Sequence, residues 1–361
     1  MVTKNYHTSF IQILLLILLL AAINLSAQTT CTYCKKSIEG NYITVEGKNF
    51  HPEHFLCSSC SQIITGSYAQ EKGKFYHPDC LTEKNAPFCD LCKKILKSSY
   101  VSYDGKKYHE ECYRNSIEKK CAVCKEGLTG YITADIYGNE FHSAHEKEYP
   151  KCDACTRLTA PEITGGGVRY NDGRAVCKLC HPNAVFADAM FNSLYKKVLA
   201  GLSSSGFSIN TENVSVKGVD KNTLKSKAAK SFTESLRGFC DTQIRSEYRN
   251  DKLVKETASF TVYVLNGLPP IYTESIIAHE LMHVWFHQNG LSGLDALTTE
   301  GSCNYLSWTW LSRSPDPAAP MVIKMLEADT DPVYGEGFRR IKQNFAGKPL
   351  KELFVYLRGR K

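Results

Sequence analysis

The pattern of apolar positions changes near residue 184. From residue 28 to this point, apolar residues stand mostly singly or in pairs among glycines and cysteines, as in small modules with little core. After it, longer periodic runs appear. Between residues 185 and 202, apolar residues return at the spacing of one helical face. That face is expected to carry Phe186, Met190, Phe191, Leu194, Val198 and Leu202.

Further along, the pattern predicts a strand followed by two helices. Residues 259–265 alternate in the manner of a strand, and turn-forming Asn, Gly and Pro follow them. A helix is expected from about Thr273, an expected N-cap, to Gly290, and a second one over residues 297–313. The sequence therefore predicts an α+β domain over residues 185–361.

The region before residue 184 contains five repeats of a metal-ligand pattern. Each begins with two cysteines separated by two residues, and a second ligand-type pair with the same spacing follows. The five sets are Cys31, Cys34, His51, His54; Cys57, Cys60, His77, Cys80; Cys89, Cys92, His109, Cys112; Cys121, Cys124, His142, His145; and Cys152, Cys155, Cys177, Cys180. Four such ligands close a tetrahedral structural zinc site.

The repeats also share a turn. A glycine precedes each second pair, at Gly47, Gly73, Gly105, Gly138 and Gly173. An aromatic residue directly precedes the third ligand in four repeats, at Phe50, Tyr76, Tyr108 and Phe141. We expect a β-hairpin in each repeat to deliver the second pair of ligands.

Disulfides are the alternative use of sixteen cysteines. They account for the cysteine count but not for the six histidines at third and fourth ligand positions, so zinc is favoured. Cys240 and Cys303 stand outside the repeats. They are expected either to form a disulfide or to remain buried free thiols, and the sequence leaves both open.

The first 27 residues predict a signal peptide, and an uncleaved membrane anchor is the less favoured alternative because the apolar run is short for a spanning helix. Lys4 precedes an apolar run over residues 10–23, and Ala27 ends a small-residue cleavage site. Export to the periplasm or the medium is therefore expected, with no stable membrane span after cleavage. The net charge of +7 is mild, and basic residues are mixed with acidic ones. No nucleic-acid partner is expected.

The expected helix at 273–290 carries the sequence His-Glu-Leu-Met-His. His279 and His283 lie one turn apart, as two ligands of one metal ion must, and Glu280 is placed to act on a water as general base. Glu300 is the candidate third ligand. An amphipathic helix with two unrelated histidines is the alternative, but apolar residues on both sides indicate a buried helix, where unpaired His and Glu are costly.

The pattern thus predicts one catalytic Zn²⁺ beside up to five structural ones. It indicates hydrolysis of a protein or peptide substrate. Tyr334 is the candidate for stabilising the oxyanion, with Arg339 behind it. His287, one turn further along the same helix, is expected at the surface or behind the ligands.

Two resemblances extend this interpretation. Residues 31–80, in which only Phe55 and Leu56 separate two fingers, resemble a LIM domain. This resemblance implies docking to a protein partner, presentation of a substrate or autoregulation. The strand, motif helix and second helix resemble the zincin peptidases. In that family a sheet edge pairs with the substrate backbone, and the strand at 259–265 is the candidate for that edge.

The whole arrangement is similar to the plant LIM-domain peptidases that restrict organ growth. The matching segments are Asn171-Asp172-Gly173-Arg174, Gly267-Leu268-Pro269, residues 278–285, Glu300-Gly301-Ser302-Cys303 and residues 334–339. This resemblance implies a zinc metallopeptidase. The third finger looks like an addition to the family's pattern.

The expected organisation is a multidomain chain in which LIM-type β-hairpin zinc fingers precede a zincin-like metallopeptidase domain. The expected segments are a signal peptide at 1–27, a LIM domain at 28–84, an additional finger at 85–116, a LIM-like pair at 117–184 and the peptidase domain at 185–361. The alternative function is a non-catalytic LIM-type scaffold with a latent or inactive peptidase domain.

Overall fold

The structure is a computed structural model that describes residues 29–97 and 99–360. The expected signal peptide lies outside these residues. The chain divides into an N-terminal unit that ends at Glu118 and a C-terminal unit, Lys119–Lys361. Each is described by itself. Within the described residues, no helix is both long and apolar enough to cross a membrane.

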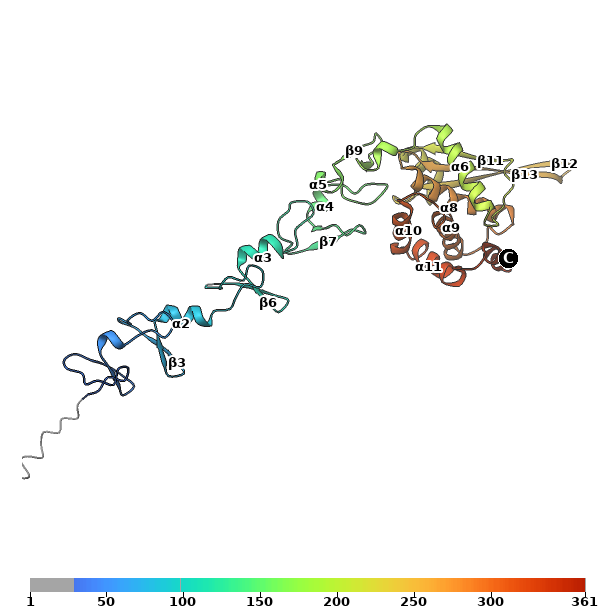
Figure 1. Ribbon diagram of the computed structural model, residues 1–361. Coiled ribbons are helices and arrows are strands. Elements are labelled where there is room, and N and C mark those ends of the chain that lie inside the picture. The colour runs from blue at the N-terminus through green and yellow to red at the C-terminus, as the bar shows by residue number, and fades with distance from the viewer. Residues whose placement is uncertain (1–28, 98, 361) are drawn as a thin grey trace, which may run out of the picture. The chain divides into compact units, whose positions relative to one another are not determined.

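Three zinc-finger modules make up the N-terminal unit, each built on a short antiparallel hairpin (Figure 1). The turns Glu46-Gly47, Lys72-Gly73 and Asp104-Gly105 have positive φ at both residues, the geometry that joins two strands with the natural twist. The elements are β1 (Ile43–Val45), β2 (Lys48–Phe50), η1 (Pro52–His54), β3 (Ala69–Glu71), β4 (Lys74–Tyr76), α2 (Pro78–Asn85), β5 (Val101–Tyr103), β6 (Lys106–Tyr108) and α3 (Glu110–Ser116).

Fingers one and two share a hydrophobic core. Phe55 of the short linker is 3% exposed, and its ring lies 5.6 Å from that of Phe50 and 5.2 Å from that of Phe75. Finger three has a small core of its own around Leu96 and Tyr108. The first two fingers therefore pack as one module, and the apolar linker is the reason.

Fingers four and five begin the C-terminal unit and also share a core, in which Phe141 packs with Leu158 and Ala160. These two fingers are the ones grouped from the sequence as a LIM-like pair at 117–184, and the shared core joins them. Their elements are β7 (Ile132–Ala134), β8 (Glu140–His142), α4 (His145–Glu148), α5 (Pro161–Thr164), β9 (Gly167–Arg169), β10 (Ala175–Cys177) and η2 (His181–Asn183).

The rest of this unit is an α/β region. Its elements are α6 (Asp188–Ser203), β11 (Val214–Val219), α7 (Lys221–Ala228), η3 (Ala229–Ser231), β12 (Gly238–Arg249), β13 (Lys252–Leu265), α8 (Pro270–Gln288), α9 (Ala296–Leu311), α10 (Ala319–Ala328), α11 (Tyr334–Phe345) and α12 (Leu350–Arg358). The sheet order is β11-β13-β12, with β11 parallel and β12 antiparallel to β13.

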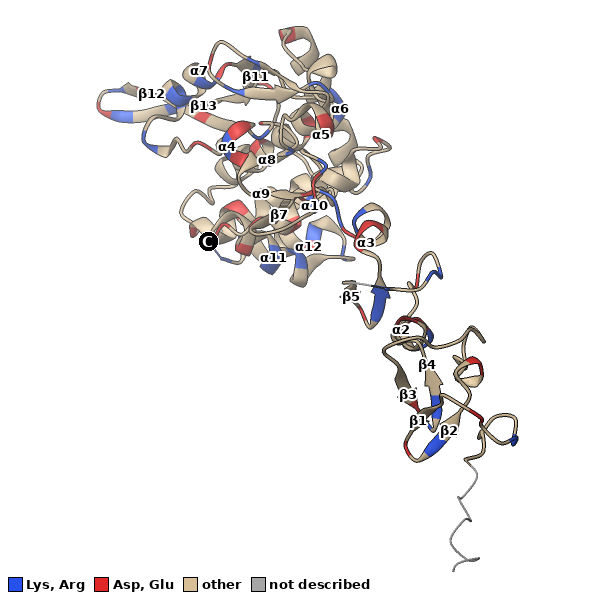
Figure 2. Ribbon diagram, turned by 90° about the vertical axis from the view of Figure 1, so that its left-hand side faces the viewer, with Lys and Arg blue, Asp and Glu red and all other residues tan. Residues whose placement is uncertain are grey.

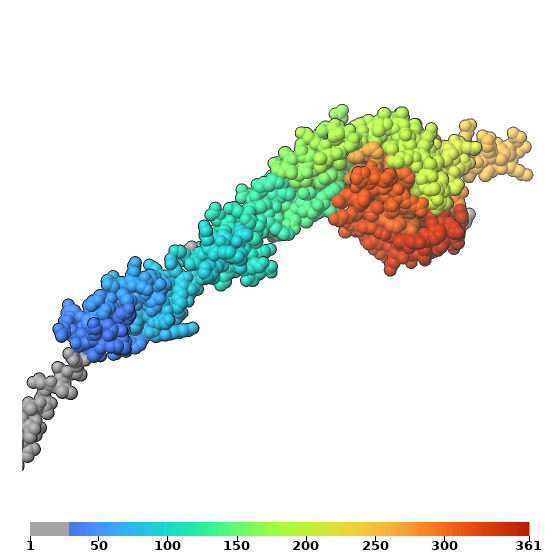
Figure 3. Space-filling view, viewed as in Figure 1, coloured from blue at the N-terminus to red at the C-terminus, as the bar shows by residue number. Residues whose placement is uncertain are grey.

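The sheet corrects the sequence prediction. The strand expected at 259–265 is the end of the longer β13, which lies at the centre of the sheet. Its partner β12 was not expected because polar residues fill most of it. The outer half of the β12–β13 hairpin is exposed, projects from the body of the unit (Figure 3) and carries basic and acidic residues (Figure 2).

Helices α6, α8, α9, α10, α11 and α12 build the main core together with one face of the sheet. Phe191, Val198 and Leu202 of α6 are buried as expected. Phe186 and Met190 are not, with exposures of 49% and 43%. Phe186 precedes the first residue of α6 and lies against the ring of Tyr170 instead.

Candidate metal centre

Helix α8 begins where proline allows a helix to start. Pro270 occupies its first position, where the missing N–H costs nothing, and Pro269 is the N-cap. Thr273, the expected N-cap, lies inside the helix instead, where its hydroxyl donates to Pro269 O at 3.3 Å. The helix is buried along most of its length, and the rings of His279 and His283 lie 5.3 Å apart on one face.

Helix α9 brings the third group to these histidines. Asp295 caps the helix by accepting a hydrogen bond from Thr298 N at 2.9 Å. Glu300 Oε2 then lies 3.1 Å from His279 Nε2 and 3.6 Å from His283 Nε2. Ligand atoms at about 2.0–2.1 Å from one tetrahedral zinc are separated by roughly 3.3 Å. Glu300 therefore lies from each of the two histidine nitrogens at a distance that fits shared ligation of one zinc ion.

His279 and Glu300 interact as oppositely charged groups within the site. Burial by itself lowers the pKa of His279, but the hydrogen bond to Glu300 and the nearby carboxylates outweigh it and raise the pKa to about 9. Burial raises the pKa of Glu300, but hydrogen bonds to the two histidines hold it well below its usual range. A histidine ligates zinc in its neutral form, so a proton and the metal compete for His279.

A polar residue behind the ligands fixes the ring of His279. Asn304 Oδ1 lies 2.9 Å from His279 Nδ1, so that Nε2 is left for a metal. The Asn304 amide also donates to Tyr334 O at 3.2 Å, which joins α9 to the start of α11. Asn304 was not predicted from the sequence. It could have been found from its position one helical turn after Glu300, on the same face of α9.

Glu280, the expected general base, lies beside the edge strand. It is 5% exposed, and a Cβ placed on Gly238 of β12 would meet its Oε1 at 2.5 Å. Burial raises the pKa of Glu280, which His279 and His283 oppose. Since β12 is the edge strand nearest to this carboxylate, it replaces residues 259–265 as the candidate substrate edge.

Of the residues expected beside the open metal position, Tyr334 lies next to a ligand, whereas Arg339 makes its contacts elsewhere. The ring of Tyr334 stacks on that of His279, with centroids 6.1 Å apart and planes 19° apart. Burial raises the pKa of Tyr334, so its hydroxyl keeps its proton. Arg339, expected behind it, instead donates to Asp329 O and to Glu336. His287 is exposed and lies near Phe260 and Ser292. Of the two expected positions, at the surface or behind the ligands, it occupies the surface.

The two cysteines outside the fingers are free thiols. Cys303 is fully buried, and its Sγ lies 3.6 Å from His283 Nε2. Cys240 lies on β12, two residues after Gly238, and is partly buried. The disulfide that the sequence left open is not formed.

All five finger sets come together as expected. In each set the four ligand atoms lie within 4.8 Å of one another. Every cysteine of the chain is unbridged, which rules against the disulfide alternative in this structure. The sets differ in burial, since all four cysteines of the fifth are buried, whereas each of the other sets has partly or fully exposed members. The Cys and His clusters fit LIM-type zinc sites.

Comparison with known proteins gives a match in each unit. Residues 31–81 match the family model of the LIM domain, and residues 245–318 match the DA1-like model, described as Protein DA1. Protein DA1 of Arabidopsis thaliana is 24% identical over 265 residues, which cover 59% of this chain and 49% of that protein. LIM domain-containing protein HDR3 of Oryza sativa subsp. japonica is 26% identical over 210 residues, covering 51% and 41%.

Protein DA1-related 6 of Arabidopsis thaliana is 26% identical over 283 residues, covering 62% of this chain and 44% of that protein. The chain thus spans about half, or less than half, of the length of the curated relatives it matches. Both its LIM fingers and its C-terminal region are similar to LIM-containing DA1 proteins.

Proposed function

We propose that this chain is a zinc-dependent peptidase whose LIM-type fingers bind a protein. The observation that carries the proposal is the convergence of His279 Nε2, His283 Nε2 and Glu300 Oε2, with the buried Glu280 alongside. Two histidines and one carboxylate leave one position of a tetrahedral zinc open for chemistry. The similarity to LIM-containing DA1 proteins supports both parts of the proposal.

Each residue of the site has a role in this proposal. When bound, zinc supplies a Lewis acid and an acidified water. Glu280 accepts a proton from the nucleophile and passes it to the leaving amine, a task that its raised pKa suits. Tyr334, with its proton retained, is the candidate donor to the developing oxyanion. Asn304 holds His279 in the tautomer that leaves Nε2 for the metal.

The edge strand indicates the form of the substrate. The backbone of β12 around Gly238 and Cys240 lies beside Glu280 at the edge of the sheet. An extended peptide that adds itself to this edge would place its backbone along the catalytic face. The proposed substrate is therefore an unfolded or locally extended segment of a protein.

The direct test compares the full chain without its first 27 residues and its Glu280→Gln variant on a peptide library, with new termini identified by mass spectrometry. We expect cleavage by the parent alone, while native mass spectrometry finds the same number of zinc ions in both. Cleavage by the variant would exclude Glu280 as the base. A zinc-loaded parent that cleaves nothing would favour the second candidate, a LIM-type scaffold with an inactive peptidase domain.

Export is part of the proposal and rests on the composition of residues 1–27 alone. Expression in a bacterial host followed by N-terminal sequencing of the exported protein tests it. A new N-terminus near Gln28 is expected, and a chain retained in the cytosol with Met1 intact would refute it.

A further inference from the structure

The fifth finger is built into the core of the α/β region. Its four cysteines share a buried cluster with Leu224, Tyr263, Leu265 and Leu268, which come from α7, β13 and the segment leading to α8. A finger that only docks a partner protein has no need to pack its metal site against the α/β region. This one packs against the start of the helix that carries His279 and His283.

The segment between β13 and α8 is held by hydrogen bonds from the fifth finger and the segment after it. Three successive carbonyls receive donors: Asn266 O from Arg174 Nη1 at 2.7 Å, Gly267 O from the Tyr170 hydroxyl at 3.1 Å, and Leu268 O from Val185 N at 2.9 Å. Tyr170 and Arg174 flank the turn of the β9–β10 hairpin, whose second strand ends at the metal ligand Cys177. One hairpin therefore both supplies a ligand of the fifth finger and donates hydrogen bonds to the segment before α8.

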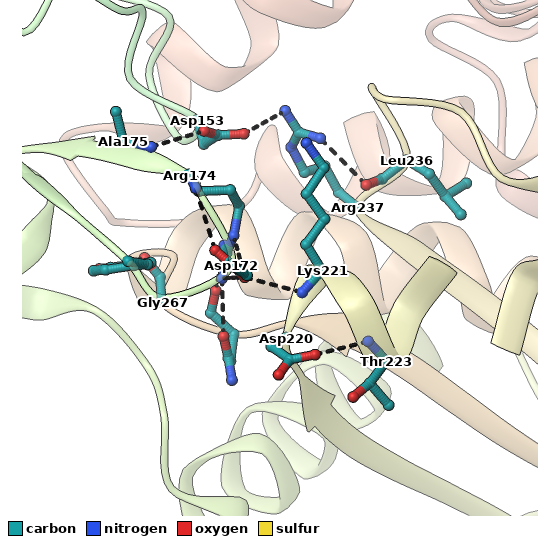
Figure 4. A network of polar contacts seen from close by, with 12 residues as sticks. Asp153, Asp172, Arg174, Ala175, Asp220, Lys221, Thr223, Leu236, Arg237 and Gly267 are labelled. Atoms are coloured by element: carbon teal, nitrogen blue, oxygen red, sulfur yellow. Dashed lines mark hydrogen bonds and ion pairs between the residues drawn. The ribbon is translucent and has the colours of Figure 1, made fainter. Parts of the chain in front are cut away.

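Arg174 is the central residue of this contact (Figure 4). Its side chain is buried and pairs with Asp172 at 2.8 Å, and its Nη2 also donates to Asn266 Oδ1 at 3.0 Å. Asp172 in turn accepts from Lys221 N at 2.9 Å, at the first residue of α7. A guanidinium with these partners fixes both the distance and the direction of the Asn266 backbone.

A second route joins the same finger to α8. Arg157 Nε donates to the Sγ of Cys155 at 3.3 Å, and its guanidinium lies 4.1 Å from the ring centre of Tyr137 in finger four. The Tyr137 hydroxyl lies 3.5 Å from that of Tyr272 in the first turn of α8. Tyr272 precedes His279 by seven residues, which is about two turns along the helix.

We infer that Arg174 is a positioning residue that couples the fifth finger to the α8 metal site, so that each of the two sites binds its ion more tightly when the other is loaded. The fifth finger thereby acts as a structural part of the metal centre and not as a docking module. From the proposed function the inference takes only that His279, His283 and Glu300 hold an ion.

The test uses the full chain and needs no substrate. The ion of the α8 site is identified as the one that a His283→Ala variant lacks. Its loss during incubation with a chelator is followed by native mass spectrometry, and hydrogen exchange is measured over residues 266–283. In Arg174→Met, which cannot donate to Asn266, we expect this ion to leave roughly three- to thirty-fold faster and exchange in that segment to rise. Arg174→Lys should restore part of both.

The matched control is Arg169→Met, which removes the same charge from an exposed position on the same hairpin. It should behave like the parent. Equal ion loss and exchange in Arg174→Met and Arg169→Met would overturn the inference.

Coupling must also run in the opposite direction. In His283→Ala, which leaves the hairpin untouched, the affinity of the fifth finger for its ion should fall by a similar factor, measured by equilibrium titration with a competing chelator. This measurement tests the coupling even if Arg174→Met fails to fold. If the fifth finger holds its ion as tightly in His283→Ala as in the parent, the inference is overturned. A parent that shows the coupling but cleaves no peptide would count against the proposed function alone.

Discussion

Replacing Gly301 with alanine should force helices α9 and α11 apart and displace Glu300, its neighbour in sequence. The two helices cross at a pair of glycines. A Cβ on Gly301 would lie 2.4 Å from both the carbonyl carbon and the oxygen of Gly337, and one on Gly337 would lie 2.3 Å from Leu297 O. All of these neighbours are backbone atoms, so rotation of a side chain cannot relieve the contact.

The magnitude follows from two opposed effects. Restoring an ordinary carbon contact requires the helices to separate by about 1 Å, and overpacking of this kind costs about 1–3 kcal/mol. Alanine in place of glycine inside a helix returns about 1 kcal/mol. We therefore expect a net loss of up to about 2 kcal/mol in the free energy of unfolding. A displacement of about 1 Å at a catalytic group can reduce activity about a hundred-fold.

Gly293→Ala is the matched control, because a methyl group on Gly293 would meet no heavy atom within 4 Å and the residue does not require a positive φ. Urea unfolding and zinc loss to a chelator are measured for both variants. Gly301→Ala should unfold at lower urea and lose the α8 ion sooner. If it is as stable as Gly293→Ala and keeps its ion equally well, the close approach of α9 and α11 does not constrain the metal site.

Three further changes test other parts of the structure. Asn304→Ala, which removes the partner of His279, should weaken zinc binding at the α8 site about ten- to hundred-fold in a competition titration, whereas Asn304→Asp should retain it. Gly238→Ala should reduce kcat on a cleaved peptide while zinc stays bound, since its Cβ would lie 2.5 Å from Glu280 Oε1, and unchanged turnover would argue against β12 as the catalytic edge. Cys57→Ser should unfold the second finger with loss of its ion and leave the α8 ion in place, as judged by native mass spectrometry.

The zinc fingers and the ligands on α8 were predictable because their information is local. Two cysteines with two residues between them converge on one ion wherever the turn lies, and glycine at the hairpin turns matches the positive φ found there. In the same way, the spacing of His279 and His283 places them on one face of any helix. Their convergence with Glu300 is what the structure added to that prediction.

What the sequence did not predict depends on contacts between distant segments. β12 is a strand because it pairs with β13, although its own residues are mostly polar and exposed. That pairing places β13 at the centre of the sheet and β12 at its edge. Phe186 resembles a core residue by its spacing, but α6 begins two residues after it.

By itself, the sequence determined which residues are able to hold metal, because ligand type and spacing are properties of short segments. Only the tertiary structure decided what surrounds those ligands: Asn304 behind His279, Gly238 against Glu280, and Arg174 of the fifth finger at the start of α8. These contacts join residues between 25 and 92 positions apart. Their geometry arises when helices, sheet and finger pack against one another, and short-range spacing carries no record of that packing.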